Sequence, residues 1–399
     1  MRLFTRTLTL GLTATLVFAL AANASASRRA SLHGNVLLED VTDVFVFPQL
    51  ALDYRNLVRF SMGADSATGD GQLIFGTDEM AFGVVAHRSD NTGPYNGLMV
   101  PAEAHTALLE GALSFGVLSS TWDAPATIVD LLLSMKMGED ANLGFRLGLA
   151  HAGTSNSTGG VDVSDGQTSL LLTGGYSTFS EDGMDMDLAL NLAIGLGSDD
   201  NGAGAETSGN DINVNLDGRF YLPMADMVEL GVLGHLGLSF GGITTATGGV
   251  EASNSVFGLD VSAGAGPVYK LEKARIAAYG VLAFGTITTD PDVDADNDAI
   301  TDTAIVVPGL RMAAEVDLTD WFQFRAGLNY AWIIAGNSDE NDTSSSSTGG
   351  SFGWSAGFGL VFDKFRADVA LQNNWLTNSP AFLGTEGPLA STVSASYSF

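Results

Sequence analysis

The sequence contains no cysteine, so no disulfide bond stabilises the fold and no thiolate chemistry is available to it. Basic residues are scarce: 17 Lys and Arg stand against 46 Asp and Glu, which gives a formal net charge of −29. An excess of negative charge this large argues against nucleic acid as a partner. After the first 20 residues no run of about 18 apolar residues occurs, which excludes a membrane-spanning α-helix there.

The first 26 residues have the order of a secretory signal peptide. Arg2 and Arg6 form a basic start, an apolar run of 13 residues follows over 8–20, and Ala24-Ser25-Ala26 supplies a cleavage site. The apolar run is too short to cross a bilayer. Cleavage after Ala26 would remove two basic residues and no acidic residue, and would leave a net charge of −31.

Apolar residues are nevertheless abundant, at 45% of the chain with a mean hydropathy of +0.20, and they alternate with small or polar residues. In 184–196 every even position is large and apolar, whereas the odd positions are Asp, Asp, Ala, Asn, Ala and Gly. The same period of two occurs in 212–222, 322–332 and 352–362. This period predicts β-strands, and their length of 11 or more residues exceeds the usual ~5–6 of soluble sheets.

Counting alternating segments predicts an all-β protein, a transmembrane antiparallel up-and-down barrel of about 16 strands, with 14 to 18 as the range. Short strands are expected near 54–62, 71–77 and 80–88. The longer strands are expected near 127–137, 141–151, 168–179, 184–197, 211–222, 227–240, 256–270, 274–288, 303–317, 320–335, 351–363, 364–374 and 388–399. Short turns alternate with long loops that are rich in Gly, Ser, Thr, Asn and Asp, at 152–167, 198–210, 241–255, 289–302, 336–350 and 375–387. The segment 89–126 is expected to be a long insertion, and it could supply a further strand, a short helix or a constriction in the mouth of the barrel.

The C-terminal strand has Val393, Ala395, Tyr397 and Phe399 on one face and Thr or Ser on the other. It resembles the last strand of bacterial outer-membrane β-barrels, which ends in Phe with an aromatic residue two positions earlier. The resemblance implies an outer-membrane, porin-like barrel of a Gram-negative bacterium. It also implies that Tyr397 and Phe399 form the signal read by the barrel-assembly machinery. Lipid and lipopolysaccharide would be further partners.

Between the leader and the barrel (54–399) lies segment 27–53, a lead-in or a lumen segment. Its compact apolar part, with Phe47-Pro48-Gln49, resembles the N-terminal hatch of the outer-membrane long-chain fatty-acid channels. In that family an Asn-Pro-Ala tripeptide stands at this place, so the Asn and the Ala are missing here.

Charged residues in phase with the small and polar positions are expected to face the lumen, because a charge facing lipid at mid-depth costs roughly 2–4 kcal/mol. If the lumen is open, these charges lie in water and set the field of a pore. If it is closed, they pair across strands. The candidates are Arg55, Arg59, Arg146, Asp217, Arg219, Glu229, Asp260, Arg311, Glu315 and Arg325.

The acidic loop 290–302 is a candidate calcium site, and no other cofactor is expected. Asp292, Asp294 and Asp296 have the spacing of calcium-loop ligands and Asp298 follows, but Thr303 stands where an EF-hand needs Glu. A solvated acidic loop is the alternative. The five histidines are scattered and no His-Glu-x-x-His occurs, so no enzyme is predicted, although a site at rim residues His87 and His151 remains the alternative.

Two classes of function are compatible with these features. The first is a channel for passive or selective uptake of small solutes, or its variant, a channel for hydrophobic compounds of the fatty-acid transporter type. The second is a non-conducting surface barrel whose acidic loops contact partners. About 16 strands leave room for an aqueous lumen, which favours a channel.

Overall fold

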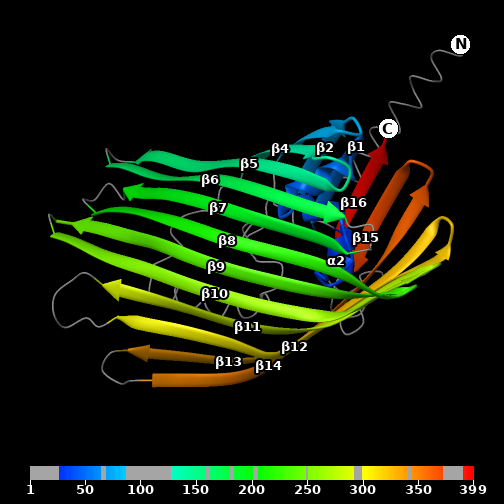
Figure 1. Cartoon of the computed structure of the whole chain (residues 1–399). Coiled ribbons are helices and arrows are strands. Elements are labelled where there is room, and N and C mark those ends of the chain that lie inside the picture. The colour runs from blue at the N-terminus through cyan, green and yellow to red at the C-terminus, as the bar shows by residue number, and fades with distance from the viewer. Residues whose placement is uncertain are drawn as a thin grey trace, which may run out of the picture.

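The computed structural model describes residues 27–63, 69–86, 127–158, 161–179, 184–200, 205–248, 250–291, 299–339, 344–371 and 390–399. Sixteen antiparallel strands form one closed barrel (Figure 1), which confirms the expected fold class and strand number. The strands are β1 (Leu57–Gly63), β2 (Gly69–Gly76), β3 (Met80–Ala86), β4 (Thr127–Lys136), β5 (Ala141–Thr158), β6 (Val161–Phe179), β7 (Asp185–Asp200), β8 (Ala205–Ala225), β9 (Val228–Thr247), β10 (Val250–Leu271), β11 (Ala274–Pro291), β12 (Ile300–Thr319), β13 (Phe322–Asp339), β14 (Ser344–Phe362), β15 (Phe365–Leu371) and β16 (Ala390–Ser398). Among the described residues, no helix is long and apolar enough to cross a membrane.

The alternation in the sequence corresponds to the two faces of the barrel wall. On β7 the outward Leu190 is 54% exposed, whereas the next residue, Asn191, points inward and is 3% exposed. Tyr269, Trp321 and Trp332 lie exposed on the outer face. An outward apolar band with aromatic residues is the surface that a lipid bilayer requires.

The barrel closes where β1 pairs with β16, with Val58 opposite Tyr397 and Phe60 opposite Ala395. The amide of Phe399 continues this pairing by donating to the carbonyl of Asn56 at 2.8 Å. The first and last strands therefore satisfy each other's backbone groups, and no open edge remains. The start of β1 and the end of β16 lie at the end of the barrel that carries the short turns, such as 272–273 and 363–364. We call this the turn end of the barrel and the opposite one the distal end.

The prediction of long loops at the distal end is wrong for most of these segments. Strands β5 to β14 are 16 to 22 residues long, so most of 152–167, 198–210, 241–255 and 336–350 is paired strand. A bilayer needs only ~9–11 residues per strand. Beyond it both faces of a strand meet water, so pairing continues through Thr-rich and Ser-rich segments that lack an apolar face. The expected loop 375–387 and the insertion 89–126 lie outside the described residues.

We expect replacement of Phe399 by Asp to lower the amount of folded barrel in the membrane several-fold, because Phe399 is aromatic, faces outward and completes the closing pair of strands. Ser398→Asp is the matched control, since it adds the same charge at the neighbouring position. Heat-modifiable mobility on gels of membrane fractions measures the folded fraction. Equal losses in the two variants would contradict a specific role for Phe399.

Candidate functional site: a plugged lumen

The N-terminal segment 27–53 lies inside the barrel, toward the turn end (Figure 1). It contains the short helix α2 (Ser27–Ser31) and two 3-10 helices, η1 (Val41–Phe45) and η2 (Pro48–Leu52). Helix α2 contacts β13 to β16, and η2 contacts β3 to β6 on another part of the wall. We call this segment the plug.

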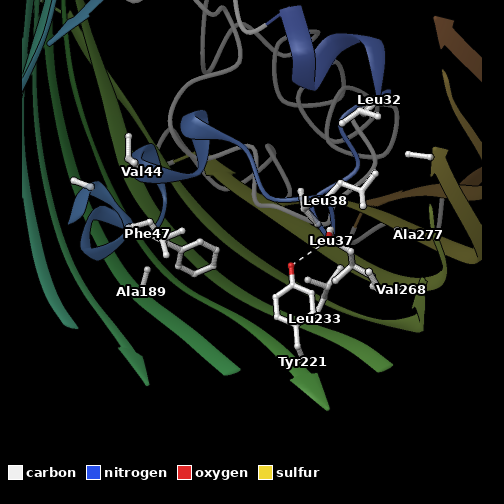
Figure 2. Packing of buried hydrophobic residues seen from close by; sticks show 14 of the residues in the cluster. Leu32, Leu37, Leu38, Val44, Phe47, Ala189, Tyr221, Leu233, Val268 and Ala277 are labelled. Carbon is white, nitrogen blue, oxygen red and sulfur yellow. Dashed lines mark hydrogen bonds between the residues drawn. The ribbon is translucent and has the colours of Figure 1, made fainter. Parts of the chain in front are cut away.

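An apolar core joins the plug to the barrel wall. Leu37 and Phe47 of the plug pack in one buried cluster with inward residues of the wall, among them Tyr221 and Leu233 (Figure 2). The hydroxyl of Tyr221 donates to the carbonyl of Leu37 at 3.1 Å. The wall also makes room for the plug backbone, because a Cβ at Gly144 would overlap Gln49. Shape and apolar burial therefore position the plug before any charge is considered.

Arg219 is the central polar contact between plug and wall. Its guanidinium is completely buried and donates to the Asp43 carboxylate at 2.8 Å and to the Val36 carbonyl at 2.9 Å, both in the plug. It also donates to Asp187 on the neighbouring strand β7 at 2.7 Å. A buried charge is tolerated only when it is paired and hydrogen-bonded in this way. The wall arginine and the plug carboxylate therefore stabilise each other, and each has a second charged partner, Asp187 for Arg219 and Arg29 for Asp43.

A second network joins the plug to the opposite part of the wall. Arg28 of the plug donates two hydrogen bonds to Glu315 of β12, at 2.9 and 3.0 Å. Glu315 also accepts from Arg325 at 2.6 Å, and Arg325 pairs with Asp368 at 2.7 Å. A third contact is made by Arg146 of β5, which donates to the carbonyl of Phe45. These contacts distribute the attachment of the plug around the lumen.

The carboxylate of Asp40 organises the plug internally. It accepts hydrogen bonds from the Thr42 amide at 2.9 Å and hydroxyl at 2.7 Å, and it pairs with Arg28 at 3.1 Å. Burial raises the pKa of Asp40, but the positive charges of Arg28, Arg29 and Arg59 outweigh burial and hold that pKa well below its ordinary value. The ionised form of Asp40 therefore stabilises the docked plug.

Among the other residues expected in the lumen, Arg59 is buried and lies 3.5 Å from Asp70, and Glu229 pairs with Lys270 at 2.6 Å. Arg311 points inward on β12 beside Gly34 of the plug. Arg55 lies at the rim, where its guanidinium pairs with the exposed Asp78 at 2.6 Å and donates to the Leu52 carbonyl of the plug at 3.1 Å. Arg55 precedes β1, so the two-residue phase of that strand does not determine its direction.

Asp217 and Asp260 lie on the distal side of the plug, and they are joined by His235. Its Nδ1 is 2.8 Å from Asp217, and its Nε2 contacts Asp260. His235 is one of the five histidines scattered along the sequence, yet its place in the inward phase of β9 was a signal that could have found it. Within the described ranges, no group of three or more His, Asp or Glu side chains is arranged to hold a metal ion. Asp292, Asp294, Asp296 and Asp298 lie outside the described residues, so calcium binding there stays a prediction.

A polar cavity of about 530 Å³ remains between the plug and the wall at the turn end. Its lining includes Arg28 and Asp40 of the plug, Tyr54 just after the plug, and Glu315 and Arg366 of the wall. The plug therefore leaves unfilled space on the side of β11 to β16.

Charge is divided along the barrel axis. Every Lys and Arg on the described strands lies at the level of the plug or nearer the turn end: Arg59, Lys136, Arg146, Arg219, Lys270, Arg275, Arg311, Arg325 and Arg366. Apart from the histidines His151 and His235, the strand residues beyond this level that can carry charge are acidic, including Asp199, Asp200, Glu206, Asp211, Glu251, Asp260, Asp290 and Asp302. Solutes approaching from the distal end therefore meet a negative field.

Among solved structures, the chain is similar to the alcaligin outer-membrane receptor FauA of Bordetella pertussis, with 8% identity, a TM-score of 0.44 and coverage of 79% of this chain and 60% of FauA. It is also similar to the toluene transporter TodX of P. putida, with 10% identity, a TM-score of 0.38 and coverage of 89% and 94%. The monoaromatic hydrocarbon channel CymD gives 10% identity, a TM-score of 0.40 and coverage of 95% and 98%. No protein-family model and no curated protein sequence matches the chain.

Replacement of Arg219 by Ala should lower the free energy of unfolding by about 3–5 kcal/mol, because the buried Asp187 and Asp43 would lose their shared guanidinium and only Asp43 would keep another cation, Arg29. Arg55→Ala is the control: its exposed pair with Asp78 should contribute ~0–1 kcal/mol. Thermal unfolding followed by gel mobility measures both variants. Equal stability of the two would contradict the role assigned to Arg219.

Acidification should loosen the plug. Because the pKa of Asp40 in the folded protein is below its unfolded value, this group stabilises the fold above about pH 4 and that contribution is lost as the pH falls further. Protease access to 27–53 as a function of pH measures the effect. An Asp40→Asn variant should lose part of this acid dependence, whereas Asp78→Asn, at an exposed carboxylate, should keep all of it.

Proposed function

We propose that this chain is an outer-membrane barrel that takes up a small solute through its lumen, with the plug closing the turn end in the resting state. The turn end faces the periplasm and the distal end faces the outside, as short turns and long strands do in such barrels. The plug itself carries the proposal: a segment docked by buried ion pairs inside a barrel of 16 strands is a closure for a lumen that would otherwise conduct.

The paired arginines favour a closed channel over a permanently open porin. Arg146, Arg219 and Arg325 are at most 2% exposed, and each is bound to a carboxylate. In an open pore such groups would be hydrated and would act on passing ions. Here their charge is neutralised by carboxylates of the wall and the plug, so uptake requires the plug to shift.

The second candidate is a non-conducting surface barrel, and the acidic distal half favours it. Its carboxylates would hold divalent cations that bridge to lipopolysaccharide. Neither candidate includes an enzymatic reaction, a bound cofactor or nucleic acid. The spacing Gly-x-Ser-x-Gly does occur at 349–353, but it lies within β14 rather than at the strand-to-helix turn that makes such a serine nucleophilic.

The absence of cysteine permits a reversible lock on the plug. The Ser355 hydroxyl of β14 donates to the Ser31 carbonyl of the plug at 3.0 Å, so the two residues are in contact and a cysteine at each can be tested for disulfide formation. Liposomes containing Ser31→Cys/Ser355→Cys should stop swelling in arabinose or butylammonium chloride when the disulfide forms, and should swell again after reduction.

Each single cysteine variant is the control and should swell like the wild type under both conditions. Unchanged swelling with the disulfide formed would show that solutes pass without movement of this part of the plug, and would overturn the proposed closure. No swelling by the wild type in any solute would leave the surface barrel as the function.

A further inference from the structure

One row of inward-facing residues crosses the wall just beyond the plug and changes from polar to apolar along its length. Backbone pairing places His235 opposite Ser262, Ser262 opposite Ala283, Ala283 opposite Val306 and Val306 opposite Ile333. Paired residues on neighbouring strands share a face and stand about 4.5–5.5 Å apart. The row therefore forms one continuous strip of wall from β9 to β13.

The polar end carries one unbalanced negative charge. Both ring nitrogens of His235 face carboxylates, Asp217 at 2.8 Å and Asp260, and an imidazole donates from both nitrogens only when it is protonated. Asp217 is further satisfied by Asn191, which donates to its second oxygen at 3.1 Å. Two carboxylates and one imidazolium leave a net charge of −1. It rests on Asp260, whose side chain is 26% exposed and whose second oxygen bonds to no described residue.

Ser262 is an independent sign of a missing partner at the same place. It is 3% exposed, and its hydroxyl makes no hydrogen bond with any residue in the described parts of the chain. Its position opposite His235 puts this hydroxyl on the lumen face beside the carboxylate of Asp260. A buried hydroxyl normally has a partner, so this one is available to a bound molecule.

The apolar end begins at the next strand. Ala283, Val306 and Ala331 form a buried cluster, and Ile333 packs against it. Three strand spacings separate Ser262 from Ile333, which is about 14 Å along the wall. A molecule with a polar head and a compact apolar body of this length would match the strip from end to end.

We infer that this strip binds an amphiphilic monoamine, with its ammonium group on Asp260 and Ser262 and its apolar body along Ala283 and the half-buried Ile333; Val306, which stands between them, is fully buried and makes no contact with it. The inference deepens the proposed uptake function and rests on it, because it names the solute class. The negative distal half of the barrel would attract such a cation and repel an anion of the same shape. The free carboxylate oxygen accepts from the ammonium group, and Ser262 gains the partner it lacks.

Binding to the full-length protein in detergent can be measured by calorimetry with 4-phenylbutylammonium as the probe and empty micelles as the blank. Two compounds test its parts: 4-phenylbutyrate keeps the body and reverses the charge, and butylammonium keeps the head and removes the ring. We expect the probe to bind more tightly than either. If 4-phenylbutyrate bound as tightly as the probe, the role of the charge would be overturned. If butylammonium bound as tightly as the probe, the role of the apolar wall would be overturned.

Asp260→Asn should weaken binding of the probe about tenfold, because a charge-assisted hydrogen bond is lost. Asp290→Asn is the matched control, since it removes the same charge from the distal half away from the strip, and it should bind like the wild type. Equal weakening in both variants would mean that only the general field attracts the probe, and would overturn the site. Gel mobility confirms the folding of each variant, and Ser262→Ala provides the same test with a smaller expected loss if Asp260→Asn does not fold.

The proposed binding site and the proposed uptake function can be refuted independently of each other. Binding of the probe without liposome swelling would retain the strip as a site and remove the channel. Swelling that is the same for ammonium and carboxylate solutes, with no binding of the probe, would retain the channel and remove the strip.

Discussion

The exclusion of charge from the lipid-facing surface is the constraint on which the rest of this structure depends. It allows ionisable groups on a membrane-spanning strand to point only inward, where 16 strands enclose a wide lumen. Filling part of that lumen with a plug takes those groups out of water. A wall guanidinium such as Arg219 then needs a carboxylate from the plug, and Asp43 supplies it. The complementary charges of plug and wall thus follow from the period of two.

The same constraint explains why the two halves of the barrel differ. Near the turn end, arginines and carboxylates alternate between plug and wall and neutralise one another. Beyond the plug the described strands hold no Lys or Arg. Asp217 and Asp260 bind His235, and other carboxylates face water or amides such as Asn337, which donates to Asp302 at 2.8 Å. Solvated carboxylates need no partner, so excess negative charge collects there without a cost to folding. The same carboxylates therefore keep the distal half of the barrel hydrated and attract cations to it.

Local pattern and distant pairing were predictable to different degrees. The alternation in 184–196 predicted β7 and its inward residues, because lipid imposes that pattern residue by residue. The alternation in 212–222 placed the start of β8 at 211, whereas the strand begins at Ala205. A strand segment outside the bilayer carries no apolar face that would mark it in the sequence. The site depends on contacts that no local pattern contains: Asp43 and Arg219 lie 176 positions apart. The sequence showed that Arg219 points inward, but it did not show that a lead-in segment would fold back to meet it.

The energetics of the plug limit how a transported solute could pass. Complete departure of the plug would break the contacts of Arg219 with Asp43, of Arg28 with Glu315 and of Arg146 with the Phe45 carbonyl. Because water would enter the vacated lumen, hydration of the released groups would offset part of the cost of breaking each contact. A solute bound with micromolar affinity releases ~8 kcal/mol, and only the part that distinguishes the two states of the plug can drive its movement. Passage beside a plug that stays docked to β5 and β8 requires less. The cavity of about 530 Å³ already lies on the side of β11 to β16, where Arg28 and Glu315 make the charged contact across it. On that side the plug is held by this contact, by the packing of α2 against β13 to β16 and by the Ser355–Ser31 hydrogen bond, so passage there requires these to open while Arg219 holds the remainder of the plug in place.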